Sequence, residues 1–249
     1  MEKYFVEIAY KGTSFSGWQR QNNAISIQEQ FENAFSKLYN KEVSIVGCGR
    51  TDAGVHASQY YFHIELPNSS FEINDLIFKL NYMIGHDIVV RQFIPVHTEA
   101  HARFDATSRS YKYFVSFKKN PFTNGQVYEY SQSGIPDFNK LNEAAQLLLN
   151  FGSFFPFCKT NSDVENYDCK LTVSNWENLD NDMIQYNISS NRFLRGMVRL
   201  IVGMCLNVSV DKISLDEVQD ALEKQTRLAK PWAAPAEGLF LWNIQYPYI

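Results

Sequence analysis

The run Gly-Arg-Thr-Asp-Ala-Gly-Val-His, residues 49–56, holds the side chains best suited to chemistry. Asp52 falls where the chain must turn between a short apolar segment and a longer aromatic one, with Gly49 and Gly54 on either side. Glycine allows positive φ or a close approach of the backbone to a ligand. Arg50 can supply an opposite charge, beside which a carboxylate keeps a low pKa and stays ionised. Such an aspartate can act as a nucleophile or stabilise a cation, or it can close a turn through its own backbone, which the spacing alone favours.

Two residues in the second half of the chain also stand out. Arg199 lies inside the apolar run 197–203, and a charge in such a run is almost never buried without a partner. The alternative is that its side chain extends to the end of the helix, where water reaches the guanidinium. Tyr111 lies in a strand pattern in which Tyr113 projects to the same side. For Tyr113 we expect an ordinary half-buried strand aromatic.

The charge distribution is compatible with RNA, although the net charge of −4 by itself argues against a nucleic-acid partner. Basic side chains gather in residues 101–119 and 192–199, whereas residues 137–182 hold eight acids against three lysines. Phosphates respond to the local field within a Debye length of about 8–10 Å, not to the total charge. Solvated surfaces explain the acidic stretch, but they do not explain 192–199, where the arginines fall among apolar residues.

Several classes of protein are disfavoured by the sequence. The charged N-terminus enters a strand pattern at once, which indicates that no signal peptide is present. The most apolar stretch, 197–210, is interrupted by Arg199 and too short to span a bilayer. The four cysteines are scattered, which suits free thiols in a reducing cytoplasm, and we find no zinc ligand set, phosphate-binding loop or dinucleotide motif. We therefore expect a cytoplasmic protein with no metal and no cofactor.

The periodicity predicts the element order β-α-β-β-α-β twice. In the first half, the expected elements are a strand at 3–10, a helix from Ser26, strands at 42–48 and 57–66, a helix at 74–84 and a strand at 87–97. In the second half, they are a strand at 109–118, a helix at 137–150, strands at 169–178 and 182–190, a helix at 193–207, a helix from Ser214 and a strand at 239–246. The expected local signals are capping boxes at Ser26 with Glu29 and at Ser214 with Glu217, an N-cap at Asn74 and a hairpin turn at 180–181.

This repeated order is that of the split βαβ, or ferredoxin-like, unit. We predict an α+β fold of two ferredoxin-like halves, residues 1–104 and 105–249, that meet near residues 99–108. Helices would cover one face of a mostly antiparallel sheet, with a catalytic cleft between the halves. The first half carries the Asp52 loop, and the second carries the Tyr111 strand and the Arg199 helix.

Residues 49–57 resemble the catalytic-aspartate motif of the TruA family of tRNA pseudouridine synthases. Other segments resemble the same family in the same order along the chain, namely 10–13, 17–21, 101–104, 109–113, 193–203 and 234–239. The resemblance covers nearly the whole chain, and it implies the pseudouridine synthase fold. Lys11 departs from the family pattern, which usually has an aspartate at that position.

The resemblance also implies roles for individual residues. Asp52 would be the catalytic aspartate, and Arg199 would pair with it and hold it ionised. The ring of Tyr111 would stack on the flipped uracil, and its hydroxyl would assist removal of the C5 proton. The expected substrate contacts are Arg50, which helps to extrude the base and fills the gap that it leaves, Leu239 at the uracil pocket, and Arg20, Arg103 and Arg109 on the RNA.

The reaction of the family is the isomerisation of uridine to pseudouridine at positions 38, 39 and 40, in the anticodon stem-loop of tRNA. The N1–C1′ bond breaks, the base turns within the site, and C5 joins C1′. Asp52 would attack C1′, stabilise an oxocarbenium-like sugar or take the C2′ proton, and the sequence leaves all three open. The resemblance further implies a homodimer with one tRNA lying across both subunits. Two rival interpretations are a non-catalytic RNA-binding module and a carboxylate glycosidase with Glu65 as the second acid.

Overall fold

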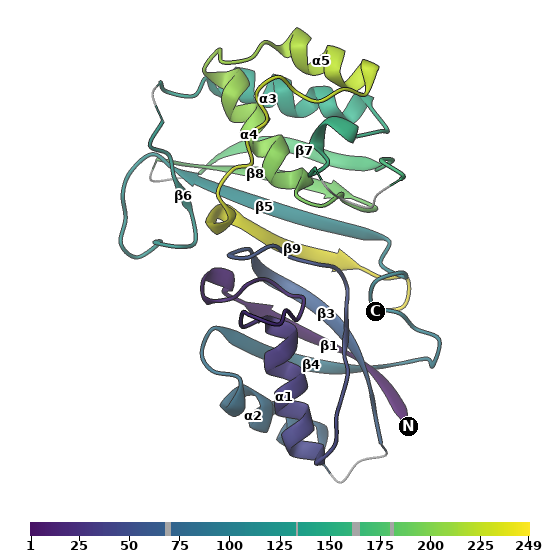
Figure 1. The fold of residues 1–249 in the computed structure, drawn as a ribbon. Coiled ribbons are helices and arrows are strands. Elements are labelled where there is room, and N and C mark those ends of the chain that lie inside the picture. Colours follow the sequence, from purple (N-terminus) through teal and green to yellow (C-terminus); the bar gives the residue numbers. More distant parts are fainter. Residues whose placement is uncertain (68–70, 133, 161–164, 180–181) are drawn as a thin grey trace. The chain divides into compact units, whose positions relative to one another are not determined.

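The structure, a computed structural model, describes residues 1–67, 71–132, 134–160, 165–179 and 182–249. The chain divides into two compact units. Unit 1 is formed by Met1–Thr107 together with Phe240–Ile249, and unit 2 by Ser108–Leu239. Each unit combines helices with a mostly antiparallel sheet, as predicted from the sequence (Figure 1).

Unit 1 contains the first six α-helices and β-strands of the chain and nearly all of the last strand. They are β1 (Glu2–Tyr10), α1 (Ile27–Tyr39), β2 (Val46–Gly47), β3 (His56–Leu66), α2 (Ile73–Met83), β4 (Ile88–Val96) and β9 (Leu239–Gln245). The strands lie in the order β4-β1-β3-β9, and the short β2 pairs with β3. The pairs β1–β3 and β1–β4 are antiparallel, whereas β9 runs parallel to β3 at His56 and Ala57.

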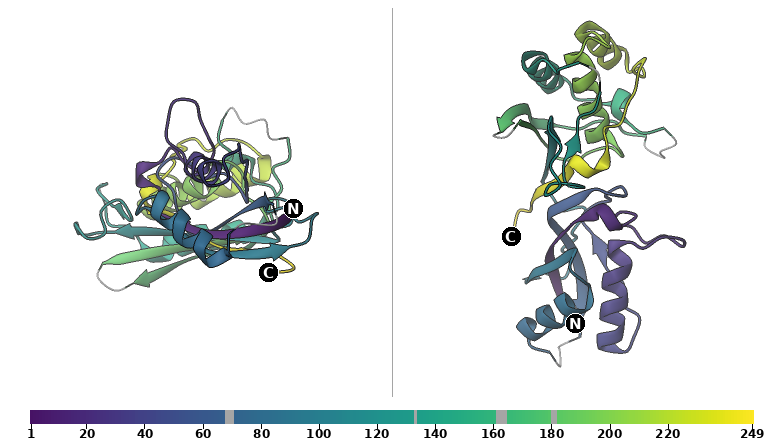
Figure 2. Two further views of the ribbon diagram at one scale, coloured as in Figure 1. Left: turned by 90° about the horizontal axis from the view of Figure 1, so that it is seen from below. Right: turned by 90° about the vertical axis from the view of Figure 1, so that its left-hand side faces the viewer.

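The helix side of this sheet is an aromatic core. Val6 in β1 lies opposite Phe62 of β3 and Phe93 of β4, and all three side chains are buried. From α1, the rings of Phe31 and Phe35 lie 4.9 and 6.2 Å from the ring of Phe62. The right-hand panel of Figure 2 shows α1 along one side of the strands. This packing holds α1 against β3, the strand that follows the loop carrying Asp52.

The other side of the unit 1 sheet holds a buried carboxylate, Glu7, which is 7% exposed. It accepts hydrogen bonds from Gln92 (2.6 Å), Arg91 (3.2 Å), the Tyr61 hydroxyl (3.3 Å) and Gln59 (3.4 Å). Burial alone would raise the pKa of Glu7, but the hydrogen bonds from Gln92, Arg91 and Gln59 outweigh it and lower the pKa below 4.5. Glu7 therefore stabilises the folded state in its ionised form.

We expect Glu7→Gln to lower the free energy of unfolding by about 1–3 kcal/mol at neutral pH, because the new amide turns a donor toward groups that themselves donate. Folding lowers the pKa of Glu7, so the difference in free energy of unfolding between wild type and variant should be fully present above pH 4.5. It should shrink as the pH falls through the pKa of Glu7 in the folded protein. Urea titrations between pH 3 and 8 measure it, with exposed Glu99→Gln as the control. A difference that persists undiminished at pH 3 would contradict this assignment.

Two local predictions for unit 1 need correction, and a third is confirmed only in part. The strand expected at 42–48 is reduced to β2, because the amides of Val43 and Ile45 donate to Ser36 Oγ and Glu32 Oε1 of α1 rather than to a strand. Helix α2 is preceded by Glu72, so Asn74 is not its N-cap. At the start of α1, the Glu29 amide donates to Ser26 Oγ as predicted.

Of the capping box expected at that helix, only this serine half is found. The Glu29 carboxylate lies 3.9 Å from the guanidinium of Arg20. The predicted strands at 3–10, 57–66 and 87–97 correspond to β1, β3 and β4, so they are confirmed.

Unit 2 is built on the strand order β5-β8-β7, with β6 paired to β5. Its elements are β5 (Ser108–Ser116), β6 (Tyr128–Glu129), α3 (Phe138–Leu147), β7 (Leu171–Leu179), β8 (Met183–Ser190), α4 (Met197–Ser209) and α5 (Leu215–Lys224). Helix α3 is held on β7 by side-chain bonds to the strand backbone: the Asn142 amide pairs with both the N–H and the C=O of Trp176. The predicted strands and helices of this half are confirmed in order and type, and the ferredoxin-like assignment of the two halves stays a prediction.

The helix predicted to begin near residue 193 begins at Met197. Gly196, its N-cap, has φ of 73°, a left-handed conformation that ends any continuation of the helix toward residue 193. The capping box at Ser214 and Glu217 is confirmed in both of its hydrogen bonds. The turn predicted at 180–181 lies outside the described residues.

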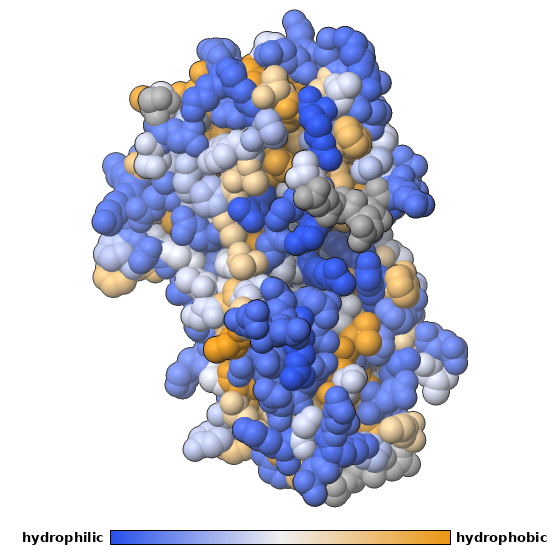
Figure 3. Space-filling view, viewed as in Figure 1, coloured by the Kyte–Doolittle hydropathy of each residue, from blue (hydrophilic) through white to orange (hydrophobic). Residues whose placement is uncertain are grey.

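The remaining surface features agree with amphipathic packing. Helix α5 buries Val218, Ala221 and Leu222, and hydrophilic residues dominate its outer face in the space-filling view (Figure 3). The four cysteines are buried and free, as the sequence predicted. Among the described residues, we find no helix with the length and apolar character needed to cross a membrane.

Candidate active site

The Asp52 loop of unit 1 is fixed through its backbone. The Asp52 carbonyl accepts a hydrogen bond from the Val55 amide (3.2 Å), which closes a turn in which Gly54 has φ of 78°. Gly49 does not adopt positive φ, so of the two expected glycines only Gly54 uses this freedom. Thr51 is buried, and its hydroxyl lies 2.8 Å from that of Tyr10. Asp52 itself is half-buried, so the turn that the spacing favoured also presents the carboxylate at the surface.

A second segment, residues 12–18, packs directly on this loop. The Gly12 amide donates to His56 Nδ1 (3.0 Å), and the Trp18 amide donates to the Thr51 carbonyl (3.3 Å). A Cβ atom added to Gly12 would lie 2.0 Å from the Val55 carbonyl oxygen, a distance that no side chain can occupy. His56 is 1% exposed and its ring stacks on Phe240 at 4.4 Å. His56 thus has a structural role, because its buried ring accepts the Gly12 amide and packs on Phe240.

The predicted RNA contacts of unit 1 have different surroundings. Arg50 is exposed next to Asp52 in the chain. The Arg20 guanidinium is about half exposed and lies 3.1 Å from the carboxylate of Glu32. Arg103 is exposed in the loop after β4. Trp18, in the same motif as Arg20, is a core residue, since it is buried and stacked on Tyr60 at 4.2 Å.

In unit 2, the strand β5 and the helix α4 are linked through two consecutive backbone carbonyls of the 234–239 segment. Arg199 Nε donates to the Ala234 carbonyl (2.6 Å), and the Tyr113 hydroxyl donates to the Pro235 carbonyl (2.8 Å). Burial raises the pKa of Tyr113 well above 10, and the positive charge of Arg199 only partly offsets this, so the phenol remains a donor. Tyr113 is fully buried rather than half-buried, because the segment around Pro235 covers it.

Tyr111 lies two residues before Tyr113 on β5 and is half-buried. Its ring packs edge to face against that of Phe193, with 5.1 Å between the ring centres. This contact orients the Tyr111 side chain. Leu239 is 5% exposed and follows Gly238, whose added Cβ would lie 2.7 Å from the Phe114 carbonyl oxygen. Three of the motifs singled out from the sequence, at 109–113, 193–203 and 234–239, therefore meet within unit 2.

The two glycines of the 193–203 motif have different surroundings. Gly203 lets α4 approach the 232–235 segment closely, because an added Cβ would lie 1.8 Å from the Trp232 carbonyl oxygen. Gly196 meets only the side chain of Lys159, at an ordinary 3.5 Å. Arg109 Nη1 donates to the Asn191 carbonyl (3.1 Å), so this guanidinium is anchored at the end of β8.

Sequence reasoning missed the residues that hold the candidate site residues in place. The carbonyls of Ala234 and Pro235 orient Arg199 and Tyr113, and Gly12 supports the Asp52 loop. All three lie in motifs already noted, but the positions of their backbone groups follow only from tertiary packing. The pairing of Asp52 with Arg199 stays a prediction.

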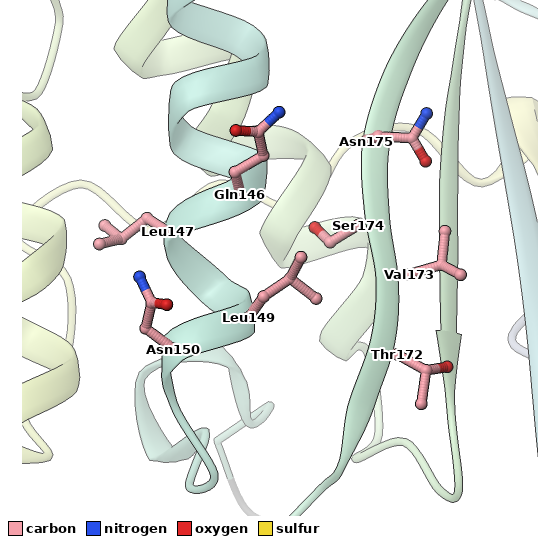
Figure 4. Close-up of a pocket in the computed structure, with 8 residues that line it drawn as sticks. All are labelled: Gln146, Leu147, Leu149, Asn150, Thr172, Val173, Ser174 and Asn175. Atoms are coloured by element: carbon pink, nitrogen blue, oxygen red, sulfur yellow. The ribbon is translucent and has the colours of Figure 1, made fainter.

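A cavity of about 590 Å³ lies elsewhere in unit 2, between α3 with the turn after it and the strand β7 (Figure 4). Leu149 and Ser174 project into this space (Figure 4). Its lining has no ionisable side chain, and none of the predicted site residues contributes to it. Within the described part of the chain, no group of three or more His, Cys, Asp or Glu side chains could hold a metal ion.

Comparison with known proteins identifies the family. The model of a family described as tRNA pseudouridine synthase matches residues 144–247. The chain is 40% identical to tRNA pseudouridine synthase A of Bacteroides fragilis over 247 residues, 99% of this chain and 97% of that protein. It belongs to the tRNA pseudouridine synthase A family. The proteins of that name from Porphyromonas gingivalis and Bacillus subtilis are 40% and 34% identical, over 99% and 96% of this chain and 98% and 97% of their own lengths.

Membership of the tRNA pseudouridine synthase A family confirms the resemblance found in the sequence. The family model covers α4 and the 232–239 segment, which contribute Arg199 and the carbonyls of Ala234 and Pro235. The Asp52 loop lies outside that match but inside the alignments with the relatives, which cover nearly the whole chain.

Proposed function

We propose that the chain isomerises uridine to pseudouridine in the anticodon stem-loop of tRNA, at positions 38, 39 and 40. The observation that carries this proposal is the Asp52 loop, a half-buried carboxylate on a backbone held at Thr51, Asp52 and Gly54, in a chain of the tRNA pseudouridine synthase A family. A loop whose backbone is held in this way reduces the reorganisation needed to place the carboxylate when the glycosidic bond breaks.

The reaction needs one negative charge near the ribose and a surface that accepts the freed base. The N1–C1′ bond breaks, the uracil turns while it remains bound, and C5 joins C1′. The proton then leaves C5 and N1 takes up a proton, so the overall change is an isomerisation. In this proposal Asp52 attacks C1′ and is later displaced by C5, stabilises the oxocarbenium-like sugar, or removes the C2′ proton and returns it. Tyr111 supplies the aromatic face for the uracil, and Arg199 supplies the positive charge that keeps the carboxylate ionised.

The same proposal assigns the substrate contacts. Extruding a base from the RNA costs about a few kcal/mol, and Arg50 helps to offset this cost. Leu239 packs at the uracil pocket, and Arg20, Arg103 and Arg109 contact the RNA. We further propose that the protein works in the cytoplasm as a homodimer on tRNA and uses no cofactor.

The glycosidase interpretation is disfavoured by the length of β3. Asp52 precedes this strand, whereas Glu65 lies nine residues beyond His56 and is 3.5 Å from Lys3. Nine residues of strand span about 30 Å, while the two carboxyl groups of a glycosidase lie about 5–9.5 Å apart. Glu65 is therefore too far along the strand to protonate a leaving group at Asp52.

The decisive experiment is to incubate the purified protein with an unmodified tRNA transcript that has uridine at positions 38, 39 and 40. We expect pseudouridine at one or more of these positions without any added cofactor, detected by mass spectrometry of nuclease fragments. A transcript with cytidine at all three positions is the control and should give no product in this arm. Folded protein that leaves every uridine of the arm unchanged would end the proposal.

A further inference from the structure

The loop between β4 and β5 presents one phenylalanine to solvent. Phe104 is 74% exposed, although it lies on a segment whose neighbours Ala100 and Ala102 are fully buried. The imidazole ring of His101 lies 4.3 Å from the Phe104 ring at an angle of 31°, so it supports one face. The guanidinium of Arg103 lies 5.6 Å from the ring centre.

Side chains within the loop and beside it hold this arrangement. His101 Nδ1 accepts hydrogen bonds from the amides of Arg103 (3.1 Å) and Phe104 (3.3 Å). Asp105 Oδ2 accepts from the His101 amide (2.7 Å) and from the Tyr248 hydroxyl (2.7 Å). The backbone on both sides of Phe104 is thus fixed before any ligand binds.

The loop is also tied to the sheet of unit 1. The Ala102 amide donates to His63 Nδ1 (3.1 Å), and the Ala102 carbonyl accepts from the Tyr246 hydroxyl (2.5 Å). Burial, with His101 and Lys3 nearby, lowers the pKa of His63 to about 4, so at neutral pH His63 remains an acceptor. Hydrogen bonds from Tyr248 and the His101 amide lower the pKa of Asp105, which keeps this second acceptor ionised.

An ordered scaffold that holds an apolar ring in water indicates a ligand with a flat face. Folding gains nothing from the exposed side of Phe104, whereas a preorganised ring binds at a low cost in conformational entropy. RNA-binding surfaces combine these two groups: aromatic rings stack on unpaired bases, and neighbouring arginines contact the backbone. Phe104 with Arg103 is such a pair.

We propose that Phe104 is a stacking platform for an unpaired base of the tRNA substrate, with Arg103 beside it on the RNA backbone. This proposal rests on the proposed function. The base is not the target uridine, because the scaffold residue His63 lies seven residues along β3 from His56, or about 23 Å of strand away from the Asp52 loop. Phe104 therefore acts in binding, and the chemistry remains with Asp52.

The test compares Phe104→Leu and Phe104→Tyr with wild type in tRNA binding and in turnover. Leucine keeps an apolar side chain but loses the stacking face, so we expect the Kd and KM for tRNA to rise about 5- to 150-fold with kcat nearly unchanged. Tyrosine should stay within about threefold of wild type. Phe78→Leu is the matched control, since Phe78 of α2 is also 74% exposed and should bind tRNA as wild type does.

The salt dependence of binding separates stacking from a disturbed loop. Phe104→Leu removes no charge, so the slope of log K against log salt should be unchanged, whereas Arg103→Gln should reduce it by about one unit. Wild-type affinity in Phe104→Leu, when wild type itself forms pseudouridine, overturns this inference and leaves the function standing. Wild type without product overturns the function instead. A change in oligomeric state with unchanged tRNA affinity would assign Phe104 to a protein interface and also overturn the inference.

Discussion

Replacing Asp52 by asparagine should reduce pseudouridine formation by about 10⁴-fold or more, as expected for the loss of a group without which the reaction has no low-energy path. The amide has the shape of the carboxylate but carries no charge, so a covalent bond to C1′, stabilisation of a sugar cation and removal of the C2′ proton are all lost. The Asp52 carbonyl, which closes the turn with Val55, is unchanged. We therefore expect the loop to keep its conformation. Single-turnover assays on unmodified tRNA, with mass-spectrometric detection, measure the effect.

The same variant distinguishes an enzyme from a non-catalytic RNA-binding module. We expect its Kd for tRNA and its unfolding temperature to stay close to those of wild type. Asp182→Asn is a suitable control, because Asp182 is an exposed aspartate at a positive-φ position, and it should retain full turnover. If Asp52→Asn and wild type behaved alike in turnover as well as in binding, the binding-module interpretation would replace ours.

The sequence predicted the elements well where local patterns determine them. The strand predicted at 3–10 and the cap at Ser26 depend on neighbours in the chain, and both are found as expected. It predicted badly where a tertiary partner takes over the backbone. The residue pattern around Val43 and Ile45 is that of a strand, but their amides donate to side chains of α1. No local signal tells whether an amide will bond to a neighbouring strand or to a helix side chain.

The last strand, β9, shows the same limit of prediction from sequence. The alternation at 239–246 predicts a strand, and β9 is present. That residues from Phe240 onward join unit 1 could not be inferred, because it depends on the parallel pairing of Phe240 and Leu241 with His56 and Ala57. A sheet edge accepts any strand of suitable length, so the sequence specifies the strand but not its partner.

The candidate site residues could be singled out from the sequence, but the groups that position them could not. Arg199 stands out as a charge in an apolar run, and Tyr111 through the motif that contains it. One acceptor of the Arg199 guanidinium is the Ala234 carbonyl, a backbone group that every residue type provides. Composition and spacing carry no information about such an acceptor.

Gly12 is the support residue with the largest expected effect, and we expect Gly12→Ala to lower turnover by about 10²-fold or more. The added methyl group would lie 2.0 Å from the Val55 carbonyl oxygen, so either the 12–18 segment or the Asp52 loop must move. Movement also weakens the hydrogen bond from the Gly12 amide to His56 Nδ1 (3.0 Å). A displacement of about 1 Å at a reacting group is enough for a rate loss of this size.

The overpacking should cost about 1–3 kcal/mol of stability, so turnover must be measured well below the unfolding temperature of the variant. Gly152→Ala is the matched control, because an added Cβ there has no neighbour within 4 Å, and it should alter neither stability nor turnover. We expect Gly12→Ala to bind tRNA with an affinity near that of wild type, since the loss lies in the placement of Asp52. A folded Gly12→Ala protein with wild-type turnover would show that the Asp52 loop keeps its working geometry without this contact, and the support assigned to the 12–18 segment would be wrong.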